Sequence, residues 1–215
     1  IDTPGHVDFT YEVSRSLAAC EGAVLVVDAT QGVEAQTVSN LLLAMNNDLT
    51  IIPVLNKIDM PAAQVDSVKQ QVLDLLGGDE DEIISISAKA GMGIDDVLEA
   101  VVERIPPSAG RRESPLRALI FDSLYDQYRG VICFIRVVDG TVRKGQKVRF
   151  FSTGVTYDVE EVGTLVLDRV ATPELQAGEV GYLTANIKEL DEAGVGDTIM
   201  DVGDEEVEPL PGYQP

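Results

Sequence analysis

The sequence predicts two units of different architecture in a chain of 215 residues, an α/β unit with a parallel sheet followed by an antiparallel β-barrel. Up to residue 105, short β-branched runs alternate with segments whose apolar residues recur at helical spacing, as in a βαβ series. After 105–115, a segment interrupted by prolines, glycine and charge, strand-like runs follow one another without a convincing helix. The expected domains are 1–112 and 113–205, with 206–215 as the start of a third.

The α/β unit is expected to contain three buried strands and four helices. Its strands are continuous apolar runs, which are typical of a parallel sheet covered on both faces, at 22–30, 50–57 and 82–87. The helices are expected at 7–19, 34–45, 64–76 and 93–105. In the last helix one apolar stripe is formed by Ile94, Val97, Leu98, Val101 and Ile105.

The barrel is expected from strand-like runs that are separated by turn signals. The runs are 116–123, 130–151, 156–165, 179–186 and 196–201. Within the longest run, Asp139-Gly140 is expected to form a hairpin turn, since this dipeptide suits the tight turns of antiparallel pairs.

The overall charge limits the partners of the chain. A formal net charge of −21 disfavours non-specific binding to nucleic acid or to an anionic membrane surface. One segment, 129–149, is an exception, because it holds six basic residues and a single acid, Asp139. The basic residues are Arg129, Arg136, Arg143, Lys144, Lys147 and Arg149. They are either solvated strand faces or a local contact to RNA, and the sequence leaves both open.

Three short motifs follow strands of the α/β unit, where open parallel sheets place their ligands. In the first, Asp2-Thr3-Pro4-Gly5-His6, a carboxylate at a strand end can hold Mg²⁺ through water. The Gly5 N–H can approach a terminal phosphate, and His6, the only histidine, can orient an attacking water. A strand-terminating turn would explain this motif alone equally well.

The second motif, Asn56-Lys57-Ile58-Asp59, comes directly after the apolar residues 51–55 of the second strand run. The Asp59 carboxylate can accept two hydrogen bonds from guanine, from N1–H and from the exocyclic amine, which adenine cannot supply. Asn56 is expected to tie neighbouring loops, and Lys57 to lie along the base. The alternative is that Asp59 is a polar N-cap of a helix starting at Pro61.

The third motif is Ser87-Ala88-Lys89, after the run 82–87. One of its backbone N–H groups can meet guanine O6, and the lysine stem can cover the base. By itself the motif would be only a loop. The order of the three motifs, at successive strand ends with a helix between each pair, makes a guanine-nucleotide site the stronger interpretation.

With these motifs the chain resembles the translational GTPases, and within them the LepA family, also called elongation factor 4. The resemblance extends over nearly the whole chain, through 1–37, 56–61, 102–107, 119–145, 177–190 and 195–199. It implies a P-loop GTPase domain, here incomplete, followed by the family's second, β-barrel domain. The family's phosphate-binding P-loop and its switch I threonine are not found in the sequence, so the chain is expected to be a fragment without turnover of its own.

The resemblance also implies roles for the motif residues. Asp2 would be the switch II aspartate near Mg²⁺, Gly5 the γ-phosphate contact, and His6 the residue that positions the hydrolytic water on the ribosome. Asn56, Lys57, Ile58 and Asp59 would recognise guanine, with Ser87, Ala88 and Lys89 completing the base pocket. The barrel would lean on small-subunit ribosomal RNA, and its expected contacts are Arg129, Arg143, Lys144 and Lys147.

For the parent protein the resemblance implies a ribosome-associated enzyme that hydrolyses GTP to GDP and phosphate, with GTP or GDP and Mg²⁺ as its ligands. A monomer in the bacterial cytoplasm or an organellar matrix is expected, and a peripheral membrane association is left open. Two alternatives remain: a non-catalytic module that binds ribosome or nucleotide, and a fragment of another translational GTPase such as elongation factor G.

Overall fold

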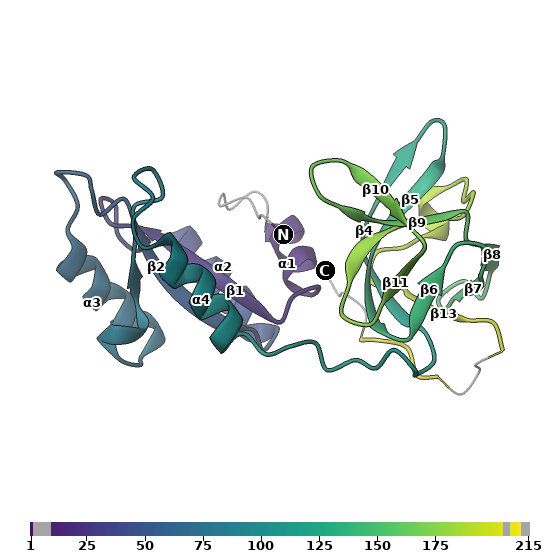
Figure 1. Cartoon of the computed structure of the whole chain (residues 1–215), viewed down its shortest axis with the longest axis horizontal. Helices are drawn as coiled ribbons and strands as arrows, with labels where there is room; N and C mark the ends of the chain where they lie inside the picture. The colour runs from purple at the N-terminus through teal and green to yellow at the C-terminus, as the bar shows by residue number, and fades with distance from the viewer. Residues whose placement is uncertain (2–9, 204–206, 212–215) are drawn as a thin grey trace. The chain divides into compact units, whose positions relative to one another are not determined.

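The computed structural model describes residues 1, 10–203 and 207–211. Contacts divide the chain into two compact units, Ile1–Pro106 and Pro107–Pro215 (Figure 1). We call them the α/β unit and the β unit. No helix among the described residues is long and apolar enough to span a membrane.

The α/β unit is built on a three-stranded parallel sheet in the order β1-β2-β3. The strands are β1 (Gly22–Asp28), β2 (Thr50–Asn56) and β3 (Ile84–Ser85). The helices are α1 (Thr10–Leu17), α2 (Ala35–Asn46), α3 (Val65–Leu76) and α4 (Ile94–Arg104), with a short 3-10 helix, η2 (Glu80–Glu82). In the register of β1 and β2, Asp28 lies opposite Asn56, so the two strands end level with each other.

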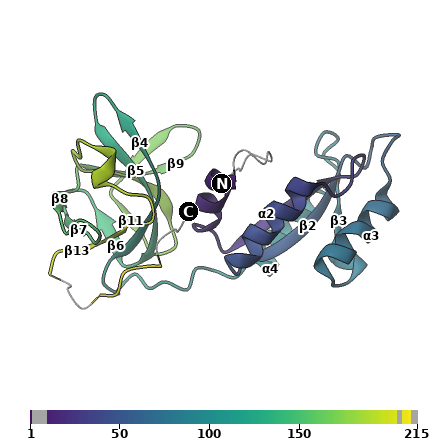
Figure 2. The same cartoon turned by 180° about the vertical axis from the view of Figure 1, so that it is seen from behind.

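Helices cover both faces of this sheet, α4 on one face and α2 on the other (Figures 1 and 2). On the α4 face, Ile52 and Val54 of β2 are fully buried in a core that includes Ala100. Their neighbours on β1, Val24 and Val26, are 37% and 56% exposed. Because paired residues of neighbouring strands point to the same face, β1 is left partly uncovered there.

The predicted α/β order is confirmed, and among its strands the third differs most in length from the prediction. The run 82–87 was expected to be one strand, but only Ile84 and Ser85 pair as β3. Glu80–Glu82 form η2 instead, and beyond β3 the chain stays attached to β2 through the Ile86 N–H, which donates to the Leu55 carbonyl at 2.7 Å. The strand begins later than predicted because residue 82 belongs to the 3-10 helix η2.

The β unit is antiparallel, as predicted, and its main sheet has eight strands in the order β10-β9-β12-β5-β4-β13-β7-β8. The strands of this sheet are β4 (Arg117–Asp126), β5 (Gly130–Asp139), β7 (Lys147–Phe150), β8 (Thr156–Asp158), β9 (Glu161–Leu165), β10 (Arg169–Thr172), β12 (Val180–Thr184) and β13 (Thr198–Asp201). A second sheet pairs β6 (Thr141–Arg143) with β11 (Glu174–Gln176), and a 3-10 helix, η3, spans Leu190–Glu192. One core contains side chains from both sheets, although the eight-stranded order does not close on itself.

The prediction of a hairpin turn at Asp139-Gly140 is wrong, because the strands on either side of it do not pair with each other. β5 pairs with β4 and β12, while β6, which follows the dipeptide, pairs with β11. Gly140 has a φ of 75°, and a Cβ there would come within 2.7 Å of the Leu116 Cα. The glycine thus lets the chain turn a tight corner from one sheet into the other instead of folding back on itself.

The segment that precedes β4 packs on the β unit. The Arg111 N–H donates to the Asp139 carboxylate at 3.1 Å, and the Arg111 carbonyl accepts from the Gly140 N–H at 2.9 Å. Arg112 forms an ion pair with Glu174 at 2.7 Å. These contacts explain why the chain divides after Pro106, whereas the predicted boundary lies at residue 112.

Candidate functional site

The carboxyl ends of β1 and β2 and the loop after β3 meet at one edge of the parallel sheet. Asn56, the last residue of β2, connects two of these loops through its side chain. Its Oδ1 accepts hydrogen bonds from the Lys57 N–H at 2.8 Å and from the Ala88 N–H at 3.0 Å. Asn56 therefore ties the segments Asn56–Asp59 and Ser87–Lys89 together.

Backbone hydrogen bonds reinforce this tie. The Ala29 N–H donates to the Asn56 carbonyl at 2.9 Å, and the Ile58 N–H donates to the Ile86 carbonyl at 3.2 Å. Lys57 has a φ of 68°, a left-handed conformation that is uncommon outside glycine. The bond from its N–H to Asn56 helps to hold this conformation, so the loop after β2 has one defined path.

Asp28, at the end of β1, is a residue of this edge that we did not select from the sequence. Its Oδ2 lies 2.5 Å from the Lys57 Nζ, and its Oδ1 accepts from the Thr30 N–H at 2.8 Å and the Thr30 hydroxyl at 2.6 Å. Burial by itself would raise the pKa of the Asp28 carboxyl, but these bonds and the Lys57 charge outweigh it and lower the pKa to about 2. The available signal was its position, since Asp28 lies near the end of the predicted strand 22–30, just as Asn56 lies near the end of the predicted strand 50–57.

The lowered pKa predicts how stability depends on pH. In the unfolded chain the Asp28 pKa returns to about 3.8. The ionised carboxylate therefore contributes fully to the free energy of unfolding above that pH, and this contribution is lost as pH falls toward 2. Asp28→Asn should therefore lower the free energy of unfolding of the chain by about 2 kcal/mol near neutral pH. Urea unfolding at several pH values should show the difference between variant and wild type shrinking from about pH 4 to pH 2.

A matched control is Asp66→Asn, which changes an exposed aspartate of α3. It should show a smaller change near neutral pH than Asp28→Asn. A deficit of Asp28→Asn that stays constant down to pH 2 would contradict the assigned interactions of its carboxylate.

Asp59 has no helix to cap. α3 begins at Val65 with Gln64 as its N-cap, so the alternative of a helix starting at Pro61 is wrong. The Asp59 side chain is exposed, and within the described part of the chain its carboxylate accepts no hydrogen bond. This carboxylate is held beside the tied loops with its hydrogen-bonding capacity open to a ligand.

The Ser87 loop has a rigid base and an exposed tip. Ser87 is fully buried, exchanges two backbone hydrogen bonds with Met92 at 3.1 and 3.0 Å, and accepts the Ala90 N–H on its hydroxyl at 3.1 Å. Ala88 and Lys89 are exposed. Because the Ala88 N–H already donates to Asn56, a base oxygen that used this group would have to replace that bond.

The first motif cannot be placed in the same way. Asp2, Gly5 and His6 lie outside the described residues. Within residues 10–203 and 207–211, no group of three or more histidine, cysteine or acidic side chains could hold a metal ion. The described edge therefore contains the two motifs expected to recognise the base, and the phosphate and magnesium assignments stay predictions.

Comparisons with known proteins agree with both units. The family described as Elongation factor Tu GTP binding domain matches residues 1–107, and Elongation factor Tu domain 2 matches residues 130–200. Proteins named Elongation factor 4 from Bacillus subtilis (strain 168) and Chlorobaculum parvum are each 57% identical over 214 residues, which cover 100% of this chain. The chain belongs to the elongation factor 4 family. It spans about 35% of the length of these relatives.

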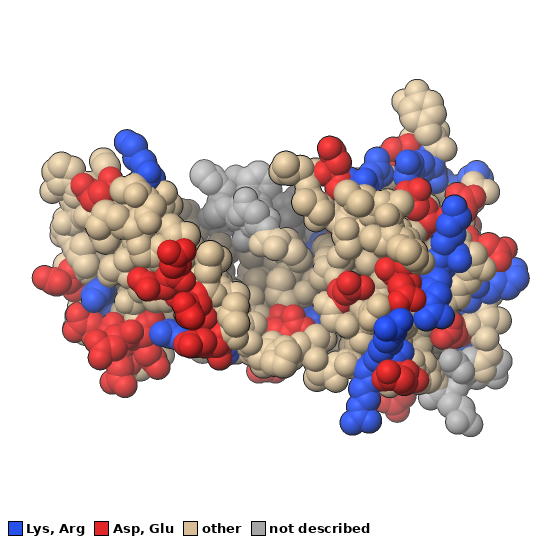
Figure 3. All heavy atoms as spheres, viewed as in Figure 1, with Lys and Arg blue, Asp and Glu red and all other residues tan. Residues whose placement is uncertain are grey.

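The basic run, 129–149, is surrounded by more acidic residues in the fold than in the sequence. Acids from outside the run pair with three of its members: Arg129 with Glu161 at 2.5 Å, Arg143 with Glu174 at 2.6 Å, and Lys147 with Asp158 at 3.0 Å. Figure 3 shows Lys and Arg gathered over the β unit with acids interspersed among them. The surface is therefore locally mixed in charge, although its cations remain at the surface.

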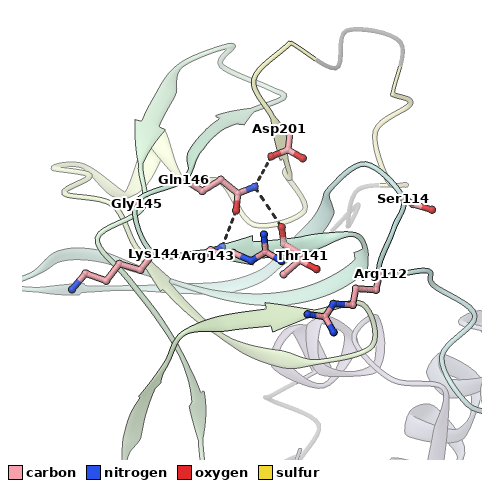
Figure 4. A pocket seen from close by; sticks show the side chains of 8 residues that line it. All are labelled: Arg112, Ser114, Thr141, Arg143, Lys144, Gly145, Gln146 and Asp201. Carbon is pink, nitrogen blue, oxygen red and sulfur yellow. Dashed lines mark hydrogen bonds between the residues drawn. The ribbon is translucent and has the colours of Figure 1, made fainter.

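A hollow of about 450 Å³ lies among these cations (Figure 4). It is lined by Arg112, Ser114, Thr141, Arg143, Lys144, Gly145, Gln146 and Asp201. Gln146 joins its walls, since its Oε1 accepts the Arg143 N–H at 2.8 Å and its Nε2 donates to Asp201 at 2.5 Å and to the Thr141 carbonyl at 3.4 Å. Arg143 and Lys144 are exposed, so two cations of the basic run line this hollow together with the Asp201 carboxylate.

Proposed function

We propose that this chain provides the base-recognition part of an elongation factor 4 that hydrolyses GTP to GDP and phosphate on the ribosome. The observation that carries the proposal is the exposed Asp59 carboxylate, which lacks a hydrogen bond in the described part of the chain and stands beside loops tied by Asn56. Guanine offers a matched pair of donors to such a carboxylate, and adenine does not.

Each residue of the second motif has a distinct part in this proposal. Asp59 accepts the N1–H and the exocyclic amine of guanine, while the stem of Lys57 lies along the base. Ile58 packs against a buried cluster that includes Val27 and Leu55, which anchors the loop to the core. Asn56 keeps Ser87-Ala88-Lys89 close enough to supply a backbone donor and a lysine stem. The site therefore combines the side chains of Asp59, Lys57 and Lys89 with a backbone frame that Asn56 ties together.

The chemical step is assigned to the first motif through the family resemblance. Asp2 would hold Mg²⁺ through water, which would neutralise charge on the phosphates, and the Gly5 N–H would face the terminal phosphate. His6 would orient the attacking water when the ribosome engages. Catalysis of this type consists mainly of positioning and charge stabilisation, so no residue of this chain needs to form a covalent bond to the nucleotide.

The proposal is tested in an extended protein, in which this chain is joined to the parts of the Bacillus subtilis relative that lie outside the matched 214 residues. The extended protein should bind GDP in preference to ADP and release phosphate from GTP faster with ribosomes than without. GDP binding without ribosome-stimulated release would favour a non-catalytic binding module. Equal affinity for GDP and ADP would contradict the proposal.

We further propose that the hollow around Arg143 and Lys144 contacts phosphates of ribosomal RNA. Changing both residues to Ala in the extended protein should weaken ribosome binding, because each lost phosphate contact removes counterion release. The slope of log affinity against log salt concentration should fall in magnitude by about 1 to 2. Sedimentation with ribosomes at several salt concentrations measures this change.

The matched control is Lys188→Ala, which removes an exposed cation of the same unit that lies outside the basic run. It should leave the salt slope unchanged. Equal binding by the double variant and the wild type at every salt concentration would make the run a solvated face. A monomeric parent in the cytoplasm or an organellar matrix completes the proposal, and the family resemblance alone supports it; peripheral membrane association of the parent stays open.

A further inference from the structure

The end of β1 holds the lysine that follows β2. The Asp28 Oδ2 and the Lys57 Nζ are 2.5 Å apart, and the two side chains are 17% and 53% exposed. Asp28 is thus largely enclosed, while much of the lysine remains open to solvent. A free lysine side chain samples many rotamers, so this contact selects a few of them.

Asp28 is itself firmly placed. Thr30 donates two hydrogen bonds to its Oδ1, from its N–H at 2.8 Å and from its hydroxyl at 2.6 Å, which leaves Oδ2 for the lysine. Its backbone is the register partner of Asn56, the residue that binds the loop after β3. The lysine is therefore attached to the same rigid strand ends as the rest of the edge.

The lysine also leaves its strand in an unusual direction. With a φ of 68°, Lys57 has a left-handed backbone, and its side chain reaches from the end of β2 back to the end of β1. Asp59, two residues further on, is exposed in the described structure. The stem of Lys57 thus spans the ends of β1 and β2, and it belongs to the residue two positions before the carboxylate that the proposed function assigns to base recognition.

We propose that Asp28 is a positioning residue for nucleotide binding, which holds the Lys57 ammonium so that the lysine stem is in place before the base arrives. This inference rests on the proposed guanine site. Binding to a preorganised side chain avoids the entropy cost of ordering it, so the effect should be seen in affinity. Asp28 itself does not touch the nucleotide in this proposal.

A double-mutant cycle in the extended protein separates this role from a purely structural one. GDP affinity is measured for the wild type, Asp28→Asn, Lys57→Met and the double variant. Asp28→Asn should weaken GDP binding by about 5- to 30-fold in the presence of Lys57. In the Lys57→Met background the same substitution should change GDP affinity by less than about twofold, because its partner is already gone.

Three further measurements complete the test. Asp28→Glu, which keeps the charge, should recover part of the lost affinity, and Asp66→Asn should bind GDP like the wild type. Urea unfolding shows that each variant is folded under the binding conditions. Unchanged affinity of Asp28→Asn, or an equal loss with and without Lys57, would overturn the positioning role while the guanine site stands. A wild type without preference for GDP over ADP would overturn the proposed function and this inference with it.

Discussion

Asp59→Asn should transfer the base preference of the extended protein from guanine to xanthine. The amide presents a donor where the carboxylate presents an acceptor, so it opposes guanine N1–H or its amine and suits the second carbonyl of xanthine. Losing two hydrogen bonds to a charged acceptor should lower GTP affinity by about 10²- to 10⁴-fold. Competition of GTP and xanthosine triphosphate for the extended protein measures the change.

The matched control for this substitution is Asp66→Asn, which makes the same chemical change on an exposed residue of α3. It should leave the preference for GTP intact. If Asp59→Asn binds GTP as tightly as the wild type, Asp59 does not read the base. The exposed carboxylate would then need another explanation.

His6→Ala should remove most of the ribosome-stimulated phosphate release from the extended protein while leaving GDP affinity nearly unchanged. A group that positions an attacking water acts on the transition state, so its loss lowers the rate of the chemical step rather than binding. The expected loss is about 10²- to 10⁴-fold in the stimulated rate, the range typical of a positioned proton-transfer group. Single-turnover phosphate release with saturating ribosomes measures it.

Ribosome binding by His6→Ala is determined in the same experiment, so that a binding defect is not mistaken for a defect in hydrolysis. His6 is the only histidine of the 215 residues, so no other imidazole of this chain can take over the role. Stimulated release at the wild-type rate would show that another group orients the water.

Helical periodicity and β-branched runs were sufficient to predict the α/β order. Val68 and Val72 of α3 are buried four residues apart, and the apolar run of β2 is buried from Ile52 to Leu55. Patterns of this kind reflect burial that each element needs wherever it packs. The second and third motifs could be placed at the strand ends for the same reason, and Asn56 does connect them.

Features that depend on partners distant in sequence were not predicted. The Lys57 to Asp28 pair joins neighbouring strands, and the pairing of Arg143 with Glu174 depends on the register of β6 with β11. Counting charges along one segment cannot reveal such pairs. The corner at Gly140 was misread because Asp-Gly is compatible with a hairpin, and only the pairing of the flanking strands distinguishes the two.

Strand β1 carries both a partly exposed apolar face and, at its end, the carboxylate that contacts Lys57. Val24 and Val26 are partly uncovered on the α4 face, and two residues after Val26 the same strand ends in Asp28. A polypeptide segment that packed on these valines would gain about 1 kcal/mol or more for each one it buried. A segment packed there would also restrain β1, which carries Asp28, and through Asp28 the Lys57 ammonium. Any change in nucleotide affinity that attachment at this face produced would be matched by an equal change in the affinity of attachment when nucleotide binds.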